Sequence, residues 1–190
     1  MVEMSLKRAI AERRAVRSFT DEAVGERNIR ELLEAAVRAP TALHAEPWAF
    51  AVVQDRRLLK QLSDRAKAMV LASSDPHAQS LASLLSQPDF NIFYDAGTLV
   101  VIGARARNPF VSADCWLAAE NLMLAACAMG LGTCVIGFAV GALQLPAVKA
   151  DLGIPADVVP VAPIIVGVPR ALPPPTSRRT PDIVAWKRQG

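Results

Sequence analysis

The sequence predicts a single domain in which helices and strands alternate along the chain and stack in α/β layers. Short apolar runs rich in β-branched residues alternate with segments of helical periodicity, an order that favours a layered fold. No internal repeat or linker divides residues 1–190, a length that suffices for one substantial core. Apolar residues form 52% of the chain and aromatic residues only 5%, so this core should be aliphatic and rich in alanine.

Four segments carry the spacing of amphipathic helices. They begin at Leu6, Glu26, Asp55 and about Ala142, and they end near residues 13–15, 38, 69 and 151. Ser5 is a candidate N-cap of the first, because its hydroxyl oxygen accepts hydrogen bonds from the free amides of a first turn. Pro40 disfavours helical angles at Ala39 and therefore ends the second.

A fifth segment, Cys115–Met129, is apolar on nearly every face, and Gly130 follows it as a candidate C′ cap. A helix without a polar face needs to be enclosed by a large domain or by a partner subunit. In a chain of this size we expect the partner subunit.

Four apolar runs predict buried strands, and they lie at Trp48–Gln54, Thr98–Ala104, Thr133–Phe138 and Val161–Val168. Residues 73–91 hold scattered serines and prolines and fit either a helical hairpin or a mobile flap over a ligand site. The tail carries the proline run Pro173–Pro175, which predicts a stiff, extended arm. Trp186 in this arm is a candidate anchor on another subunit.

Composition and motifs exclude several classes of function. The formal net charge is only +3, which argues against nucleic acid as the main partner. Two histidines without ligand spacing argue against a metal site, and the isolated Cys115, Cys127 and Cys134 predict buried thiols in a reducing compartment. Without a secretory signal or a run of about 18–20 apolar residues, the protein should be soluble and cytoplasmic. The chain also lacks the motifs of Rossmann domains, phosphate-loop NTPases and α/β-hydrolases.

Two clusters in the first third of the chain indicate a site for an anionic, planar cofactor. Arg13, Arg14 and Arg17 place three guanidiniums within five positions, and such groups bind phosphate bidentately. A solvated helix end beside the helix dipole would also explain these arginines. The second basic pair, Arg178 and Arg179 beyond the proline arm, favours the phosphate interpretation.

The second cluster is the segment Ala39–Phe50, which combines prolines, small residues, an imidazole and a large aromatic ring. This composition suits a loop laid along a flat ligand. His44 stands near Thr41, Glu46 and Trp48, which favours a ligand-facing role over that of an ordinary loop histidine. Glu46 fits equally well as a partly buried acid that pairs with an arginine.

Four motifs in consistent order resemble the nitroreductase family of FMN-dependent oxidoreductases, over about residues 5 to 188. They are Arg13–Phe19, the loop from Ala39 to Ala42 that continues to Glu46-Pro47-Trp48, Gly130–Phe138 and Pro173–Arg178. The resemblance implies an α+β fold, layered α/β/α, with a mixed central sheet flanked by helices. It also implies an intertwined homodimer with one FMN at each end of the interface. Cys115–Met129 would then form the intersubunit core, and residues 169–190 an arm over the partner subunit.

The resemblance further implies a site that both subunits build. Its cofactor-binding residues would be Arg13, Arg14, Ala15, Arg17, Pro40, Thr41, Ala42, His44, Ile136, Gly137, Arg178 and Arg179. Arg13, Arg14 and Arg178 or Arg179 would hold the flavin phosphate, and Arg17 would reach the ribityl chain and the pyrimidine edge. Backbone amides around Ile136 and Gly137 would face flavin N5 and O4. The residues from Pro40 to His44 would come from the other subunit.

The chain departs from the family pattern at positions expected to affect its substrate. Members often carry Ser-x-x-Asn-x-Gln-Pro-Trp, and this chain has His44 in place of the asparagine and Glu46 in place of the glutamine. The lysine that many members place near the pyrimidine is missing, so Asp89 or Asn91 is expected to contact the ring instead. His44, Glu46 and Asn91 are therefore the candidate substrate residues.

On this basis we expect an FMN-dependent NAD(P)H oxidoreductase with ping-pong turnover. NADH or NADPH would deliver hydride to flavin N5 and leave before a nitroaromatic, quinone or similar acceptor enters. Arg17 would favour the reduced flavin electrostatically, and no side chain is required as an acid or base. Two alternatives remain: a flavin-binding or flavin-processing protein without NAD(P)H turnover, and a small nucleic-acid-binding module.

Overall fold

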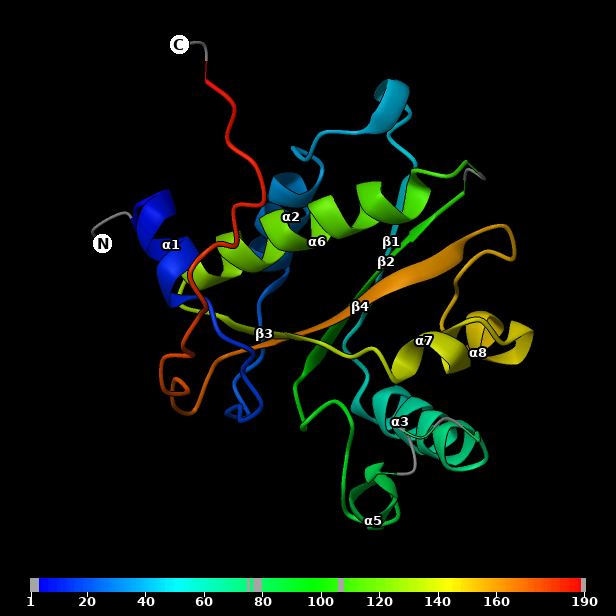
Figure 1. Cartoon of the computed structure of the whole chain (residues 1–190). Helices are drawn as coiled ribbons and strands as arrows, with labels where there is room; N and C mark the ends of the chain where they lie inside the picture. The colour runs from blue at the N-terminus through cyan, green and yellow to red at the C-terminus, as the bar shows by residue number, and fades with distance from the viewer. Residues whose placement is uncertain (1–3, 75, 77–79, 106–107, 189–190) are drawn as a thin grey trace.

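The computed structural model describes residues 4–74, 76, 80–105 and 108–188, and in them a four-stranded sheet lies between two layers of helices (Figure 1). In spatial order the strands are β1 (Trp48–Val53), β2 (Thr98–Ala104), β4 (Val159–Gly167) and β3 (Gly132–Val135). One face is covered by α1 (Leu6–Glu12), α2 (Glu26–Ala36) and α6 (Val111–Ala128). The other is covered by α3 (Arg56–Leu71), α7 (Ala139–Leu143) and α8 (Pro146–Asp151). The layered α/β/α class is therefore confirmed.

The three strand pairs of this sheet are all antiparallel. A mixed sheet was implied by the family resemblance, and the parallel pairing in the described part of the chain is an isolated bridge between Ala15 and Thr133. The direction of a strand pair depends on where the connecting segments return the chain. This long-range property has no local signal in the sequence.

The sheet separates two cores, because alternate side chains of a strand point to opposite faces. In β2, Leu99 and Val101 pack in the core that includes residues of α3 and α7, whereas Val100 and Ile102 pack in the core of α2 and α6. All seven residues of β2 are buried. Burial on both faces explains why this strand is an uninterrupted apolar run in the sequence.

Ser5 caps α1 as expected, and Asp55 caps α3. The Ser5 hydroxyl oxygen accepts a hydrogen bond from the Arg8 amide at 3.3 Å. At the start of α3, the Asp55 carboxylate accepts one from the Arg57 amide at 2.8 Å. These side chains satisfy amides that have no partner within the helix, so they fix where each helix begins.

The single helix expected around Ala142–Asp151 is wrong, because the structure has α7 and α8 there. Pro146 begins α8, and the preceding Leu145 has an extended ψ of 131°. A proline disfavours helical angles in the residue before it, and this breaks the segment in two. The segment 73–91 contains the short helix α5 (Ala82–Leu85); the rest of the expected hairpin or flap lies partly outside the described residues.

Helix α6 starts earlier than expected and ends in a Schellman motif. Gly130 has φ +75°, its amide donates to the Cys127 carbonyl at 3.1 Å, and the Leu131 amide donates to the Ala126 carbonyl at 2.8 Å. Glycine suits this position because the left-handed angle is unfavourable for residues with a side chain. Although α6 is apolar, no helix in the described ranges has the length and hydropathy needed to cross a membrane.

The three cysteines are free thiols, with Cys115 and Cys134 buried and Cys127 half-buried. Burial raises the pKa of each thiol, and it raises the pKa of Cys115 to about 11 with a further contribution from the nearby Asp114 charge. All three are therefore protonated at neutral pH, and their environment fits a structural role.

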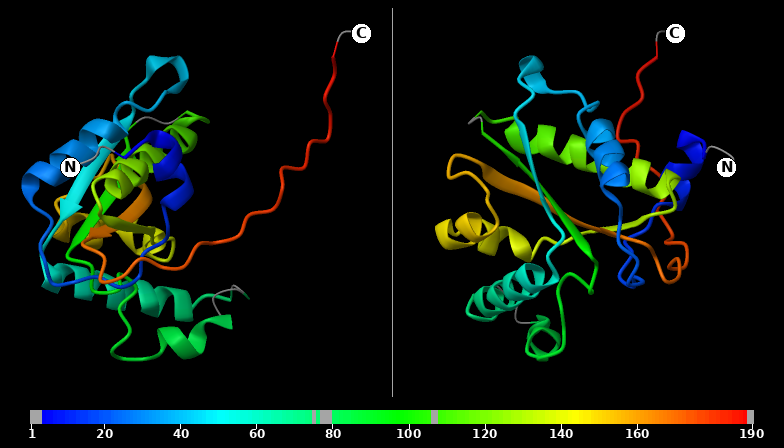
Figure 2. Two further views of the ribbon diagram at one scale, coloured as in Figure 1. Left: turned by 90° about the vertical axis from the view of Figure 1, so that its left-hand side faces the viewer. Right: turned by 180° about the vertical axis from the view of Figure 1, so that it is seen from behind.

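The chain after residue 169 forms an extended arm that leaves the body of the domain (Figure 2). Its root is fixed by a bridge between Phe19 and Pro169 and by a 3.0 Å hydrogen bond from the Arg170 amide to the Ser18 carbonyl. Trp186 near its end is 68% exposed. The arm is extended as its prolines predict, and its placement over a partner subunit remains a prediction.

Candidate functional site

A pocket of about 500 Å³ opens between the loop after β3 and the segment that contains α5. We call it the apolar pocket, because ten of its twelve lining residues are apolar or glycine, Arg17 and Tyr94 being the others. It is lined by Arg17, Leu81, Leu84, Leu85, Phe90, Ile92, Tyr94, Cys134, Val135, Ile136, Gly137 and Phe138.

A second pocket of about 500 Å³ adjoins the first and is mainly polar. Arg17, Phe90 and Tyr94 line both pockets and so form the partition between them. The other residues of this polar pocket are Ser18, Phe19, Asp21, Arg56, Asp89, Asn91, Asp95 and Arg170. An apolar space beside a charged one suits a ligand with a flat ring and polar substituents.

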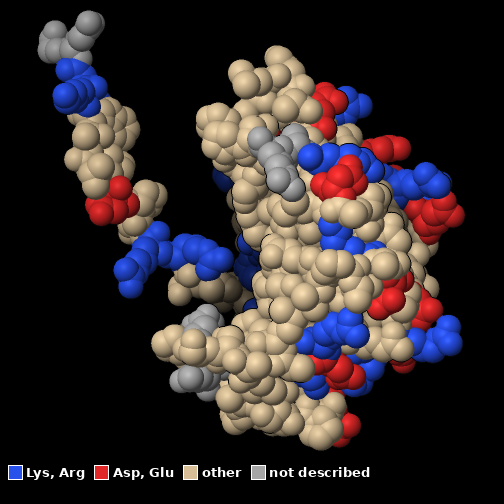
Figure 3. All heavy atoms as spheres, turned by 90° about the vertical axis from the view of Figure 1, so that its right-hand side faces the viewer, with Lys and Arg blue, Asp and Glu red and all other residues tan. Residues whose placement is uncertain are grey.

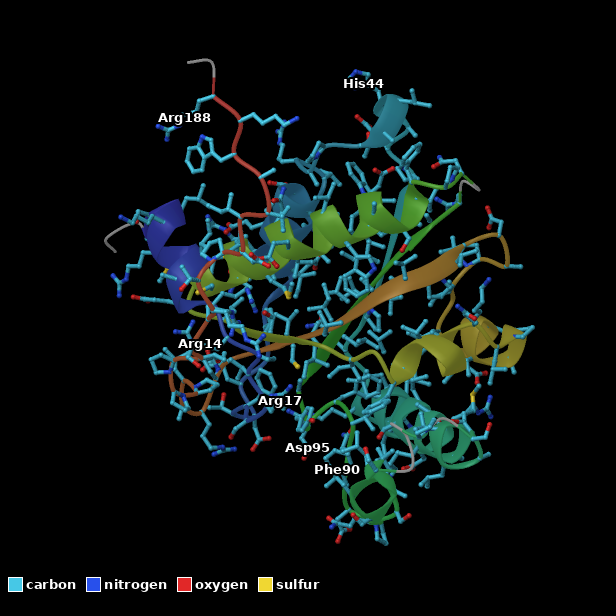
Figure 4. The ribbon with its side chains drawn as sticks, in the orientation of Figure 1. Arg14, Arg17, His44, Phe90, Asp95 and Arg188 are labelled. Carbon is cyan, nitrogen blue, oxygen red and sulfur yellow. The ribbon has the colours of Figure 1, made fainter. Side chains whose placement is uncertain are left out.

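Arg17 lies where the two pockets meet, at the end of the molecule that also holds Phe90 and Asp95 (Figure 4). Its guanidinium carbon is 5.8 Å from the centre of the Tyr94 ring, within the range of a cation–π contact. Tyr94 in turn meets Phe90 edge to face, with 5.7 Å between the ring centres. The partition is therefore a row of three side chains in contact, with one permanent positive charge.

The loop that carries Tyr94 has a strained backbone, which Asn91 holds in place. Tyr94 and Asp95 have φ of +51° and +56°. The Asn91 amide nitrogen donates to the Asp95 carboxylate at 2.9 Å, and its side-chain oxygen accepts from the Phe93 amide at 2.9 Å. The Asn91 side chain is thus committed to the loop, and its predicted contact with a ligand remains untested.

Helix α3 anchors the same loop from the side of the core. The buried Lys67 ammonium donates to the carbonyls of Phe90 at 2.8 Å and Gln87 at 3.2 Å. The Ser63 hydroxyl oxygen accepts from the Ile92 amide at 3.1 Å. Both contacts join loop backbone to a helix, so this wall of the apolar pocket is anchored to α3.

Arg13 and Arg14 follow α1, and much of their hydrogen bonding is internal. Arg14 Nη1 donates to the carbonyls of Ala11 at 2.7 Å and Arg13 at 2.9 Å, as the helix-end interpretation predicts. Arg13 pairs with Glu120 of α6 at 3.5 Å. However, Arg14 Nε is buried and has no hydrogen-bond partner among the described residues. This leaves a buried donor for which an anionic ligand is a suitable acceptor.

The loop after β3 offers one backbone amide rather than two. The Ile136 amide donates to the Pro163 carbonyl at 2.9 Å, because the pairing with β4 continues past the end of β3, and it is not available to a ligand. The exposed Gly137 donates to no backbone acceptor within the described ranges. A Cβ at Gly137 would meet nothing within 4 Å, so the wall is open there.

The structure separates the second cluster from the first within one chain. His44 lies at the opposite end of the molecule from Arg17 (Figure 4). This loop contains the 3₁₀ turn η1 (Ala42–His44). Pro40, His44 and Glu46 are exposed, whereas Thr41 and Ala42 are half-buried. These residues therefore do not line the apolar pocket of their own chain.

The basic pair of the arm is exposed and also stands apart from both pockets. Arg178 Nη1 donates to the neighbouring Ser177 carbonyl at 3.2 Å, and Arg179 is exposed. Basic and acidic side chains are intermingled on the face of the body seen in Figure 3. That face offers no continuous basic surface for nucleic acid.

Sequence reasoning missed Tyr94, Phe90 and Lys67 as residues that shape the site. One signal was available for the first of them, since Tyr94 is the single tyrosine of the chain and directly precedes the acid at the entry to a predicted strand. Lys67 had no such signal, because its role depends on which loop packs over α3.

Comparison with known proteins identifies the fold and the family. A family model described as "Nitroreductase family" matches residues 10–168. A protein of Archaeoglobus fulgidus assigned as NADH dehydrogenase/NAD(P)H nitroreductase is 29% identical over 159 residues, which cover 83% of this chain and 82% of the relative. The FMN reductase [NAD(P)H] of Bacillus subtilis is 27% identical over 172 residues, 85% of this chain and 65% of the relative.

A solved structure agrees with these matches. The nitroreductase with bound FMN from Bacteroides fragilis superposes with a TM-score of 0.84 at 26% identity, and the match covers 96% of this chain and 98% of that one. The similarity thus spans the sheet, the helices on both faces and the loops around the apolar pocket. This chain belongs to the nitroreductase family.

Proposed function

We propose that this protein is an FMN-dependent NAD(P)H oxidoreductase that reduces a nitroaromatic, quinone or similar acceptor by ping-pong turnover. The observation that carries the proposal is the apolar pocket, which is lined by Arg17 and by the exposed backbone of Gly137. Relatives support it, since the Bacteroides fragilis structure binds FMN and the Bacillus subtilis relative is an FMN reductase.

The residues present fit each part of FMN. The apolar pocket, about 500 Å³ in volume, suits the flat ring system. Arg17 and the Gly137 amide offer a positive charge and a hydrogen-bond donor to its polar edge. The unpartnered Arg14 Nε, with Arg13 close to it in the chain, offers charged donors to the phosphate. Arg178 or Arg179 would complete the phosphate site from the arm.

When bound, FMN supplies a hydride acceptor and donor at N5, and the protein orients the reactants around it. Arg17 would hold the polar edge of the ring system, where its positive charge would favour the reduced form of the cofactor. The apolar lining favours stacking of a nicotinamide ring or an aromatic acceptor and keeps water away. No side chain of the pocket is required to transfer a proton.

We further infer a homodimer in which the residues from Pro40 to His44 of one chain complete the pocket of the other. Two observations support this. Trp116 and Leu117 of α6 are 42% and 45% exposed, which leaves an apolar helix face without cover in the single chain. The arm likewise exposes Val184, at 91%, and Trp186, which suits contact with a second chain. His44 and Glu46 would then select the acceptor.

We also infer a cytoplasmic location, because the three cysteines are free thiols, as a reducing compartment would keep them.

The test is FMN binding and turnover by the purified protein. The protein is expected to be yellow, to quench the fluorescence of added FMN, and to oxidise NADH or NADPH in the presence of a benzoquinone. Arg17→Ala should weaken FMN binding by about 10- to 100-fold, the effect of losing one hydrogen bond to a charged group. Arg57→Ala is the matched control, since Arg57 lies on α3 with its side chain 88% exposed and lines neither pocket.

Each outcome decides a part of the proposal. A colourless protein that ignores added FMN would overturn it. FMN binding without oxidation of either nicotinamide would instead favour a flavin-binding or flavin-processing protein. An equal loss of affinity in Arg17→Ala and Arg57→Ala would remove Arg17 from the site.

A further inference from the structure

The loop from Thr41 to Glu46 concentrates backbone strain far from the apolar pocket. Leu43, His44 and Glu46 have φ of +57°, +52° and +40°, and they are three of the five non-glycine residues with left-handed angles in the described part of the chain. Such angles bring Cβ close to the following carbonyl and are unfavourable. They persist only where surrounding contacts fix the backbone, and they cluster at functional sites.

Asp114 of α6 supplies those contacts at both ends of the loop. Its carboxylate Oδ1 accepts a hydrogen bond from the Ala42 amide at 3.1 Å. Its backbone carbonyl accepts one from the Trp48 indole nitrogen at 3.1 Å. Within the loop, the Thr41 hydroxyl oxygen accepts a longer bond from the Glu46 amide at 3.4 Å. One residue of a rigid helix thus fixes a segment that precedes it by about 70 positions, as the 72- and 66-residue separations of the two bonds show.

The Asp114 side chain makes its hydrogen bond with the loop and not with its own helix. It is 2% exposed, and its second oxygen, Oδ2, has no donor among the described residues. A buried carboxylate with one hydrogen bond is costly to the fold. Because the Asp114 carboxylate accepts its hydrogen bond from Ala42, Asp114 mainly fixes the position of the loop.

The loop fixed in this way presents its side chains to solvent. Leu43 is 90% exposed, and His44 and Glu46 are exposed as well. Exposed side chains add little packing energy that could offset the backbone strain of the loop. The loop geometry is therefore suited to contact with another molecule.

We propose that Asp114 is a positioning residue, which holds the loop from Thr41 to Glu46 so that His44 and Glu46 face the partner subunit's pocket in one orientation. The identity of that pocket rests on the proposed function. The fixing of the loop by Asp114 rests on the hydrogen bonds of this chain alone.

Three variants separate this role from a general loss of stability. Asp114→Asn keeps a side-chain oxygen that accepts from the Ala42 amide. Asp114→Leu has the same branched shape, with two larger methyl groups in place of the carboxylate oxygens and no acceptor. Asn121→Leu is the matched control on the same helix, because the Asn121 side chain also makes a long-range hydrogen bond with backbone: it donates to the Ala35 carbonyl of α2 at 3.2 Å.

The first measurement is amide hydrogen exchange of the full-length protein, which needs no cofactor. Peptides that cover residues 41–47 should exchange about 10-fold faster in Asp114→Leu, the effect of one lost hydrogen bond, and at the wild-type rate in Asp114→Asn and Asn121→Leu. Unchanged exchange in Asp114→Leu overturns the proposal. An equal rise across β1, β2 and α6 overturns it too, because Asp114 would then support the whole fold.

The second measurement is made on the FMN-loaded enzyme with a benzoquinone as acceptor. Asp114→Leu should raise KM for the quinone several-fold more than it lowers kcat, and Asp114→Asn should restore KM. A freed loop with unchanged KM and FMN affinity overturns the positioning role. If the wild-type protein binds no FMN, the proposed function fails along with the assignment of the pocket, while hydrogen exchange still decides whether Asp114 fixes the loop.

Discussion

Arg17 lies beside the apolar pocket because the preceding residue, Val16, packs closely against Gly132. Gly132 is buried at the start of β3, and a Cβ there would lie 2.8 Å from the Cβ of Val16. The Val16 amide also donates to the Thr133 carbonyl at 2.9 Å. The segment between Arg14 and Arg17 therefore lies directly against β3, which a side chain at position 132 would prevent.

Gly132→Ala should lower the free energy of unfolding by about 1–3 kcal/mol, because the added methyl group overpacks a buried contact. In the double variant, Val16→Ala removes the two methyl groups that would lie 2.8 and 2.9 Å from the added Cβ at position 132. The double variant should therefore recover part of the lost free energy of unfolding. Urea denaturation of both single variants and the double variant measures the coupling.

Gly97→Ala is the control for this cycle. A Cβ there would lie 3.8 Å from the end of the flexible Arg56 side chain, an ordinary contact. Strictly additive losses in the double variant would contradict the proposed collision between positions 16 and 132.

At the scale of elements, α3 is the scaffold for one wall of the apolar pocket. It begins at the Asp55 cap, and Ser63 and Lys67 along it hold the loop that carries Tyr94. The position of the wall therefore depends on a helix that contributes no residue to the pocket itself.

The stability that Asp55 contributes should depend on pH. Hydrogen bonds from the Arg57 and Leu58 amides to its carboxylate hold the pKa of Asp55 below its usual value. A group whose pKa is lower in the folded state stabilises the fold above its unfolded pKa, about 3.9, and this stabilisation is lost as the pH falls through the folded value. The wild type should therefore melt above Asp55→Ala at neutral pH, and the gap should close on acidification below about pH 4.

Melting curves by circular dichroism between pH 3 and 7 measure this gap. Asp55→Asn is the control, since asparagine also caps helices but does not titrate, and it should stay close to the wild type at pH 7. A gap between the wild type and Asp55→Ala that is the same at every pH would show that the carboxylate charge is irrelevant to the cap.

At the scale of the whole molecule, the uncovered surfaces predict a dimer. In the described part of the chain, large apolar side chains are exposed on α6, near the end of the arm, and at Leu43 beside His44. Light scattering should give twice the 20.3 kDa mass of the chain at micromolar concentration. Trp116→Glu with Leu117→Glu should shift the mass toward the monomer, because charges would be buried in the interface.

Leu71→Glu is the matched control for the interface. Leu71 is 41% exposed, much like Trp116 and Leu117, but it lies at the end of α3 on the other side of the sheet. A stable wild-type monomer would contradict the dimer and the shared site, whereas dissociation in both sets of variants would point to a general effect of added charge.

Much of the fold followed from local patterns. The strand Thr98–Ala104 was predicted with its observed ends, Ser5 and Gly130 were predicted as helix caps, and Asp55 as the start of a helix. The prediction of one helix over Ala142–Asp151 did not include the effect of Pro146, which disfavours helical angles at Leu145. Of the candidate site, Arg17, Ile136 and Gly137 do line one pocket, but the occupied Ile136 amide was not foreseeable from sequence.

The sequence by itself determined the layered class, the order of the elements and the family, because periodicity, caps and motifs are properties of neighbouring residues. Only the tertiary structure decided that Tyr94 makes a cation–π contact with Arg17, that Asn91 and Lys67 hold the pocket wall, and that His44 lies far from Arg17. These facts depend on contacts between segments distant in the chain. The physical reason is that such contacts are fixed by the packing of the two cores around the sheet, which no local pattern specifies.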